Sequence, residues 1–272
     1  YYRLEQYQNA ATELQRRLPS LSGTDRARTL LLLGETYRAL DRRDDAMTQY
    51  QLIVDEHSNS PYAPPARFGL AWQHYAAGRY EAAARAFAAV RSTDHALASR
   101  APYYEAASRA LAGAPDEALT LYRAYLDQND AGRLATEAQY EIGLLLYQQD
   151  AYREATTAFQ AVTQGGSAEG PIGEAYFWLG NAHLATDNLD RALDAYTEAI
   201  DRGAASASVR ARVRFQKAWS LYQDGQYDEA GTEFQALAEA HPETARGQEA
   251  LFWGADTFYQ REQFAEARRL FR

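Results

Sequence analysis

Small and aromatic residues recur along this chain at a nearly constant spacing. Gaps of 35 to 38 residues separate eight alanines: Ala10, Ala46, Ala83, Ala118, Ala155, Ala192, Ala230 and Ala267. A large apolar residue follows each alanine by four positions: Leu14, Tyr50, Phe87, Tyr122, Phe159, Tyr196, Phe234 and Phe271. Glycine or alanine precedes seven of them by twelve positions: Gly34, Ala71, Ala106, Gly143, Gly180, Ala218 and Ala255. Three columns in one register predict a tandem repeat of a single structural unit.

Each column has a steric reason if the repeated unit is a pair of antiparallel helices. Two helices approach closely only where the facing side chains are tiny, so the small columns predict the contact between the first and second helix. The large residue lies on the same face of the second helix as its alanine and fills the space towards the next unit. Turn-forming pairs separate the helices, for example Gly78-Arg79, Gly113-Ala114 and Gly225-Gln226. The pattern therefore predicts an all-α stack of helical hairpins.

The residues in these columns resemble the signature of the tetratricopeptide repeat. The resemblance is clear in Leu33, Gly34, Tyr37, Ala46 and Tyr50, and again in the run from Gly225 to Phe234. It covers essentially the whole chain and implies a right-handed α-α superhelix of about seven hairpins. The segment 58–83 is similar to repeats of bacterial cell-envelope members of the family, such as the Tol–Pal coordinator and outer-membrane assembly lipoproteins. That likeness favours a periplasmic or envelope location over a cytoplasmic one.

We expect residues 1–272 to form one solenoid. Its units lie near 27–60, 64–97, 99–132, 136–169, 173–208, 211–244 and 248–272. Residues 1–19 read as the tail of an earlier repeat, with Tyr7, Ala10 and Leu14 in its second helix. Neither end resembles a polar cap, which solenoids need for solubility, so we expect the chain to be a piece of a longer array.

The unit at 99–132 departs from the pattern. Glu105 and Arg109 occupy positions that are mostly apolar elsewhere. Either the register slips, which would make Tyr104, Ala107 and Leu111 the core, or a polar pair is buried. The slip is favoured because burying unpaired charge is costly. A second irregularity is the long loop at 164–171, which we interpret as a soft joint between two halves of the array.

Composition excludes several classes of function. The chain has no cysteine, so it has neither disulfides nor thiolate metal sites. No apolar run is long enough to span a membrane. The formal charge of −9 argues against nucleic acid as a partner, because nucleic-acid binding needs a basic surface.

The search for chemistry finds no catalytic, cofactor or metal motif. Gly165-Gly166 lacks the following Lys and Ser/Thr of a phosphate loop and reads as a linker. The five histidines show no metal-ligand spacing. His74 and His183 stand in a packing column and are interpreted as inter-helix residues with one satisfied nitrogen. We therefore expect a protein that is not an enzyme.

The surface of interest is the concave side, which the first helices line in solenoids of this family. Positions three before, one after and four after each small residue should point into that groove. The triplets Phe68/Trp72/Tyr75 and Phe215/Trp219/Tyr222 place three rings on one helix face. Trp72 and Trp219 should be the main anchors, because Trp and Tyr dominate interface hot spots. The predicted groove residues are Phe68, Trp72, Tyr75, Tyr140, Tyr147, Phe177, Asn181, Phe215, Trp219, Tyr222, Phe252 and Tyr259.

The leading hypothesis is a non-enzymatic scaffold that binds a peptide or partner protein along this aromatic groove. Extended, Pro-rich or amphipathic-helical segments would suit it. Some family members clamp a chaperone's C-terminal carboxylate with Lys and Asn, but here Asn181 has no lysine beside it. Two alternatives stay open. The chain could self-assemble through uncapped ends in an envelope complex, or it could regulate a catalytic domain outside this sequence.

Overall fold

A computed structural model describes residues 2–165, 170–202 and 207–271. The regular structure of these residues is helical throughout, which confirms the all-α prediction. The chain divides into two compact units, Tyr1–Gln128 and Asn129–Arg272.

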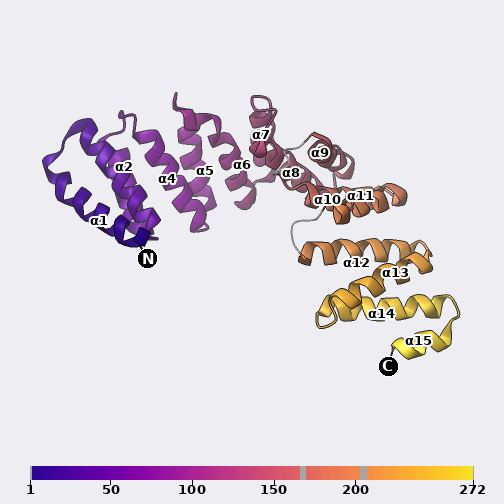
Figure 1. The fold of residues 1–272 in the computed structure, drawn as a ribbon. Coiled ribbons are helices and arrows are strands. Elements are labelled where there is room, and N and C mark those ends of the chain that lie inside the picture. The colour runs from indigo at the N-terminus through magenta and orange to yellow at the C-terminus, as the bar shows by residue number, and fades with distance from the viewer. Residues whose placement is uncertain (1, 166–169, 203–206, 272) are drawn as a thin grey trace. The chain divides into compact units, whose positions relative to one another are not determined.

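The first unit contains seven α-helices that lie side by side and are joined by short connections (Figure 1). Their bounds are α1 Tyr2–Arg17, α2 Gly23–Ala39, α3 Arg43–Glu56, α4 Ala63–Ala76, α5 Tyr80–Arg91, α6 Ala101–Leu111 and α7 Pro115–Leu126. Two short 3-10 helices, Leu18–Ser20 and Ala96–Ser99, lie in connections before α2 and α6.

The second unit continues the same alternation in its described residues. Its helices are α8 Arg133–Gln148, α9 Tyr152–Gly165, α10 Ile172–Leu184, α11 Leu189–Asp201, α12 Ala207–Gln223, α13 Tyr227–Ala240, α14 Ala245–Gln260 and α15 Phe264–Leu270. Even-numbered helices are the first helices of hairpins and carry the Gly/Ala column. Odd-numbered helices carry the Ala column.

The turn inside each hairpin is made by a residue in the left-handed conformation. The predicted turn glycines have this geometry, with φ of +71° at Gly78, +82° at Gly113 and +81° at Gly225. The same place is taken elsewhere by Asp41, Asp150, Asp187 and Glu262. After α4, the Gly78 N–H donates to the Tyr75 carbonyl at 3.0 Å, and the Arg79 N–H donates to the His74 carbonyl at 2.9 Å. These bonds satisfy the last carbonyls of the helix and reverse the chain within a few residues.

The small column allows rings of the second helices to sit directly on the first helices. A Cβ added to Gly34 would lie 2.6 Å from the Tyr50 ring, and one added to Gly69 of the next hairpin would lie 2.8 Å from it. Gly180 stands in the same relation to Tyr196, at 2.5 Å. Tyr50 therefore fills the space between one hairpin and the next, as the column pattern predicts.

The Ala and aromatic columns form the core of both units. The seven alanines from Ala46 to Ala267 are at most 3% exposed, and the six rings from Tyr50 to Phe234 are at most 1% exposed. Phe271 departs from this, at 46% exposed. The N-terminal register is also different, because Ala11 and not Ala10 packs with Leu14 against α2. Tyr7, Ala10 and Leu14 lie together in α1, as expected, and Tyr7 is 40% exposed.

The register slip expected at 99–132 is wrong. Ala106 is fully buried and Leu111 is 52% exposed, so the regular register of the small column holds in α6. Glu105 is consequently in the core, 4% exposed. Its carboxylate lies 3.3 Å from Arg91, and Arg109 pairs with Glu117 at 3.3 Å. Two ion pairs therefore join α6 to α5 and to α7. Glu105 is buried in spite of the desolvation cost that favoured the register slip.

The soft joint expected at 164–171 does not coincide with the division of the chain. The two units meet in sequence between Gln128 and Asn129. The loop itself belongs to the second unit, and its residues 166–169 lie outside the described part of the chain. A single continuous solenoid over 1–272 stays a prediction.

Candidate partner-binding site

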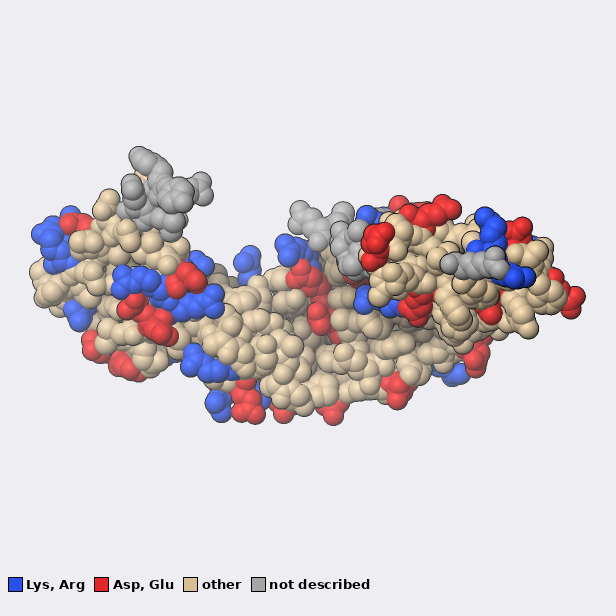
Figure 2. Space-filling model, turned by 90° about the horizontal axis from the view of Figure 1, so that it is seen from below, with Lys and Arg blue, Asp and Glu red and all other residues tan. Residues whose placement is uncertain are grey.

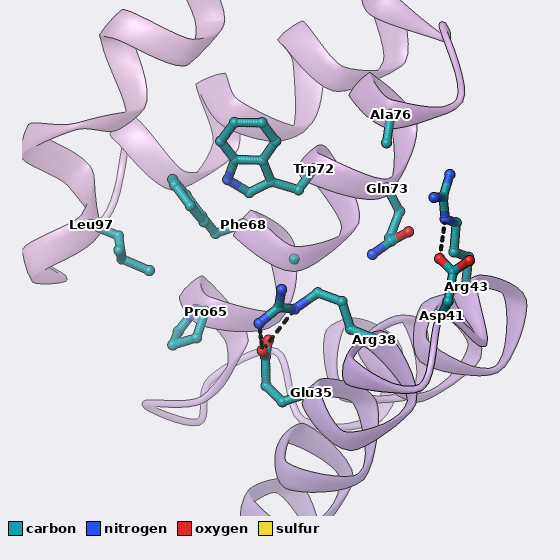
Figure 3. A pocket seen from close by; sticks show the side chains of 11 residues that line it. Glu35, Arg38, Asp41, Arg43, Pro65, Phe68, Trp72, Gln73, Ala76 and Leu97 are labelled. Carbon is teal, nitrogen blue, oxygen red and sulfur yellow. Dashed lines mark hydrogen bonds and ion pairs between the residues drawn. The ribbon is translucent and has the colours of Figure 1, made fainter. Parts of the chain in front are cut away.

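A hollow of about 550 Å³ opens on the first unit between α2 and α4 (Figure 3). The α2 side and the turn after it contribute charged residues, and α4 contributes two rings, Phe68 and Trp72. Its volume lies within the usual range of ligand-binding pockets. The lining residues are Glu35, Arg38, Asp41, Arg43, Pro65, Phe68, Gly69, Trp72, Gln73, Ala76 and Leu97.

The charged wall of the hollow is fixed by hydrogen bonds. The Arg38 guanidinium donates to one Glu35 oxygen from Nε at 2.9 Å and from Nη2 at 2.7 Å. The other Glu35 oxygen accepts from the buried Tyr50 hydroxyl at 2.7 Å. Glu35 raises the pKa of Arg38, and burial together with Glu35 raises the pKa of Tyr50 above its ordinary value. Glu35 therefore accepts hydrogen bonds from both a core hydroxyl and a surface guanidinium.

The turn after α2 adds a second ion pair to this wall. The Arg43 Nε donates to Asp41 at 2.9 Å. With two arginines and two carboxylates, the wall has no net charge. The hollow thus offers polar groups without selecting strongly for a charged partner.

The opposite wall consists of rings that are half-buried. Phe68 meets Phe87 edge-on with centroids 5.3 Å apart. Trp72 meets Tyr104 of the next first helix at 4.9 Å and Tyr75 at 5.5 Å. One side of Phe68 and Trp72 is therefore committed to packing, and the other side lines the hollow (Figure 3).

Gln73 stands between the two walls. Its side chain is 7% exposed and points across the hollow toward Arg38 and Arg43 in Figure 3. Its carboxamide forms no hydrogen bond within the described residues, and neither of its polar atoms is cut off from solvent. The sequence columns did not flag Gln73, because its position is two after the small residue, where packing residues are expected.

In the second unit the predicted groove rings are closed over by the next first helix. Trp178 of α10 packs on Tyr147 of α8 at 5.1 Å. Trp253 of α14 packs on Trp219 and Tyr222 of α12 at 4.7 and 5.4 Å. Tyr104 plays the same part for Trp72 in the first unit. These closing rings all stand two positions before the small residue of their helix.

A hydrogen-bonded group completes the α12–α14 closure. The Tyr222 hydroxyl donates to Asp256, and Gln260 Nε2 donates to both, at 3.2 Å to Tyr222 and 3.0 Å to Asp256. Burial and the bond to Asp256 raise the pKa of Tyr222 to about 12. Trp219, expected as a main anchor, is therefore part of a packed contact between hairpins.

Phe177 and Phe215 are buried, so the expectation that their rings face a groove is wrong. They are 5% and 9% exposed. The guanidinium of Arg212 lies 4.5 Å from the Phe177 ring centre, and that of Arg246 lies 4.4 Å from the Phe215 ring centre. Each arginine comes from the next first helix and covers the ring with a cation–π contact.

The remaining predicted residues have varied surroundings. Asn181 accepts from the Tyr196 hydroxyl at 2.7 Å, as Glu35 does from Tyr50. Tyr140 is half-buried, and burial raises its pKa to about 12. Phe252 and Tyr259 are 51% and 55% exposed. The structure thus gathers only Phe68 and Trp72 of the predicted set into the hollow.

The two histidines of the packing column lie against neighbouring helices. Burial lowers the pKa of both His74 and His183, which favours their neutral forms. The Nδ1 of His74 is buried and has no hydrogen-bond partner. Within the described ranges, no cluster of three His, Asp or Glu is arranged to hold a metal ion.

The surface carries charges of both signs. On the face drawn in Figure 2, basic and acidic residues are interspersed rather than gathered by sign. Among the helices that the structure describes, none has both the length and the apolar character needed to cross a membrane.

Comparison with known proteins agrees with this architecture. Models of the tetratricopeptide repeat match residues 28–60, 68–133, 112–170, 140–207 and 215–272. No curated protein matches the chain by sequence.

Several solved structures have a similar fold. The C-terminal part of a TPR repeat-containing protein from Cytophaga hutchinsonii has a TM-score of 0.71 at 14% identity, covering 87% of this chain and 91% of that one. YrrB, described as a TPR protein with an unusual peptide-binding site, has a TM-score of 0.52 at 19% identity, covering 64% and 84%. PilF of Pseudomonas aeruginosa has a TM-score of 0.57 at 19% identity, covering 76% and 88%. At these identities the likeness concerns the fold alone.

Proposed function

The chain belongs to the tetratricopeptide repeat family, and we propose that it is a non-catalytic scaffold that seats a partner peptide in the hollow between α2 and α4. Members of this family generally serve as scaffolds for protein interactions. The observation that carries the proposal is the hollow itself, which joins two half-buried rings to a wall of fixed polar groups. Such a combination of apolar walls and a few oriented polar groups is typical of binding sites. The peptide-binding site of YrrB, a protein of the same fold, is consistent with this function.

Trp72 and Phe68 are the apolar anchors in this proposal. Their packed sides already hold the two rings in place, so Phe68 and Trp72 lose little conformational freedom when a partner binds. Tyr75, Tyr140, Tyr147, Asn181, Tyr222, Phe252 and Tyr259 stay candidate contacts for a longer partner.

A blocking substitution tests the proposal without disturbing the core. Ala76 lines the hollow and is exposed, so Ala76→Trp fills the space and leaves the packed side of Trp72 alone. Short random peptides displayed on phage are selected on the immobilised wild-type protein, and the affinities of the best binders are then measured. We expect Ala76→Trp to weaken them by about tenfold or more, since the loss of one good apolar contact has that size.

Ala185→Trp is the matched control, because Ala185 is an exposed residue at the corresponding end of α10. It should leave the affinity unchanged. A wild-type protein that selects no peptide, or peptides that bind Ala76→Trp as tightly as wild type, would discard the proposal.

A second candidate function is self-association through α14 and α15. Large apolar side chains are exposed there: Leu251, Phe252, Tyr259, Phe264 and Phe271, at 43% to 56%. Exposed apolar patches often mark interaction sites. Light scattering over a concentration series tests this candidate, with Phe264→Glu as the variant that should stay monomeric. A wild-type chain that is monomeric at every concentration rules it out.

A further inference from the structure

A second hollow, of about 330 Å³, lies between α3 and α4. We call it the α3 groove, because five of its six lining residues belong to α3. It shares no lining residue with the hollow between α2 and α4. The lining residues are Met47, Thr48, Gln51, Leu52, Asp55 and Leu70.

Apolar side chains form half of this lining. Met47 and Leu52 are half-buried and pack against the core of the first unit, and Leu70 is 7% exposed. Met47 is the only methionine of the chain. Methionine is adaptable in shape and is frequent at surfaces that bind helices of varied sequence.

The pair Met47 and Leu52 is particular to α3. These residues stand one and six positions after the alanine of the repeat column. Each of the other second helices has at most one large apolar residue at these positions, and α5 has Ala84 and Ala89. Stacking of the hairpins therefore does not require apolar bulk there, and a bound partner gives it a purpose.

The polar residues of the groove are bonded within α3. The Thr48 hydroxyl donates to the Asp44 carbonyl at 2.9 Å, and the Gln51 carboxamide donates to the Asp55 carboxylate at 2.8 Å. An extended segment would lose water from its main-chain groups here without gaining a row of free partners, which is unfavourable. A helix satisfies its own main chain and presents apolar side chains on one face. The groove therefore favours a helix as its occupant.

Charge restricts this helix further. Asp55 is the one charged residue among the lining residues, and it is exposed and forms no ion pair within the described residues. It stands eight residues after Met47, which corresponds to about 12 Å along the helix. At the Met47 end, the Arg79 guanidinium donates to Met47 Sδ at 3.5 Å and likewise has no ion pair in the described part of the chain. A basic residue of the partner helix complements Asp55, and an acidic one complements Arg79.

We propose that the α3 groove docks an amphipathic helix of a partner protein. The helix places apolar side chains on Met47, Leu52 and Leu70, and a basic side chain beside Asp55. The inference goes beyond the proposed function, because the α3 groove and the hollow between α2 and α4 have no residue in common.

A library of helices tests the proposal. Alanine-rich helices of about 20 residues, with one face randomised, are displayed on phage and selected on the immobilised wild-type chain. Thr48 is exposed at the groove, so Thr48→Trp fills the space without entering the core. We expect it to weaken the best helices by about tenfold or more, since the loss of one good apolar contact has that size. Thr157→Trp, at the same position of α9 and also exposed, is the matched control and should bind them like wild type.

Asp55→Lys tests the charge of the partner with a second exposed substitution. Each basic residue of a helix that Thr48→Trp blocks is replaced in turn by glutamate. One replacement should weaken binding to wild type by about threefold and strengthen binding to Asp55→Lys by a similar factor. The absence of any such exchange of preference would overturn the assignment of a basic residue to Asp55.

A proline in the middle of the selected helix tests its conformation. It should abolish binding, because proline breaks a helix. Binding that survives the proline would show an extended occupant and overturn the proposal.

The variants also separate this inference from the proposed function. Ala76→Trp should bind the selected helices like wild type, and Thr48→Trp should bind the peptides of the α2–α4 hollow like wild type. A selection in which Thr48→Trp weakens no helix overturns the α3 groove as a docking site and leaves peptide binding in the other hollow standing. If Thr48→Trp instead abolishes self-association of the chain in light scattering, the occupant is a second copy and the partner helix is wrong.

Discussion

Two junctions between neighbouring hairpins, α2–α4 and α12–α14, are built from the same repeat but present different surfaces. The position two before the small residue is Gly69 in α4 and Trp253 in α14. Trp253 covers Trp219 and Tyr222 of the preceding first helix. Gly69 has no side chain, and the space above Glu35 and Arg38 is the hollow.

In these two junctions, the residue two positions before the small residue distinguishes the closed junction from the open one. Tyr104 and Trp178 occupy the same position and also close on rings of the preceding helix. Glycine is needed at position 69 for a second reason, since a Cβ there would lie 2.8 Å from the Tyr50 ring. The residue that permits tight packing of Tyr50 is therefore also the residue that leaves the hollow open.

The largest effect is expected from removing a closing ring. Trp253→Ala should lower the free energy of unfolding by about 3 kcal/mol, because it leaves Trp219 and Tyr222 uncovered in a packed junction. Urea unfolding followed by circular dichroism measures this. Phe252→Ala, at the exposed neighbour, should cost less than about 1 kcal/mol. Equal losses in the free energy of unfolding for the two substitutions would show that the packing of Trp253 on Trp219 and Tyr222 does not stabilise the junction.

A methyl group at the open junction should be the next most damaging change. Gly69→Ala places a Cβ 2.8 Å from the Tyr50 ring, which Gly34 and the bond to Glu35 hold from the other side. We expect a loss of about 2 kcal/mol from overpacking, although alanine favours helices by about 1 kcal/mol over glycine. Gly165→Ala in α9, where nothing lies within 4 Å, is the control and should be neutral or stabilising. A stabilised Gly69→Ala protein would contradict the steric account.

Glu105 tests whether ring closure alone sets the stability of a junction, because it lies beside the closing ring Tyr104. Burial raises the pKa of Glu105, with Glu117 acting in the same direction and Arg91 and Arg109 opposing it. The folded chain thus binds the Glu105 proton more tightly than the unfolded chain. Stability from this group is full below the unfolded pKa and is lost as pH rises through the folded pKa.

Glu105→Leu should accordingly stabilise the protein by about 1 kcal/mol at neutral pH, since four other hairpins place Leu or Ile there. The gain over wild type should shrink as the pH is lowered toward the ordinary pKa of a glutamate. Urea unfolding of both proteins at a series of pH values gives the difference directly. A stability difference between Glu105→Leu and wild type that grows as the pH is lowered would contradict the raised pKa of Glu105.

The smallest effect concerns the arginines that cover buried rings in the second unit. Arg246→Ala should cost about 0.5–1 kcal/mol through the lost cation–π contact with Phe215. Its ion pair with Glu249 is exposed and contributes little. A double-mutant cycle with Phe215→Leu isolates the contact, and Arg268→Ala on α15 serves as the exposed control. A coupling near zero would remove the stabilising role assigned to Arg246.

Much of the fold could be predicted from the residue columns, because the close contacts they describe lie within a single hairpin. The alanines from Ala46 to Ala267, the rings from Tyr50 to Phe234 and the turn glycines take the places that were predicted. Phe177 and Phe215 were placed wrongly because their covers, Arg212 and Arg246, come from the next hairpin and follow no fixed spacing. Glu105 was missed because the argument from burial cost overlooked the half-exposed Arg91, whose charge offsets part of that cost. The hollow depends on a side chain that Gly69 lacks, and a missing group leaves no periodic signal.

Hydrogen–deuterium exchange of the full chain, with and without the tightest selected peptide, tests the central claim most directly. The account predicts slower exchange on peptide binding in residues 35–43 and 65–76, which carry the walls of the hollow. It predicts no change in residues 219–260, where rings already close the junction. Protection confined to 219–260, or no protection at 35–43 and 65–76 while the peptide is bound, would contradict it.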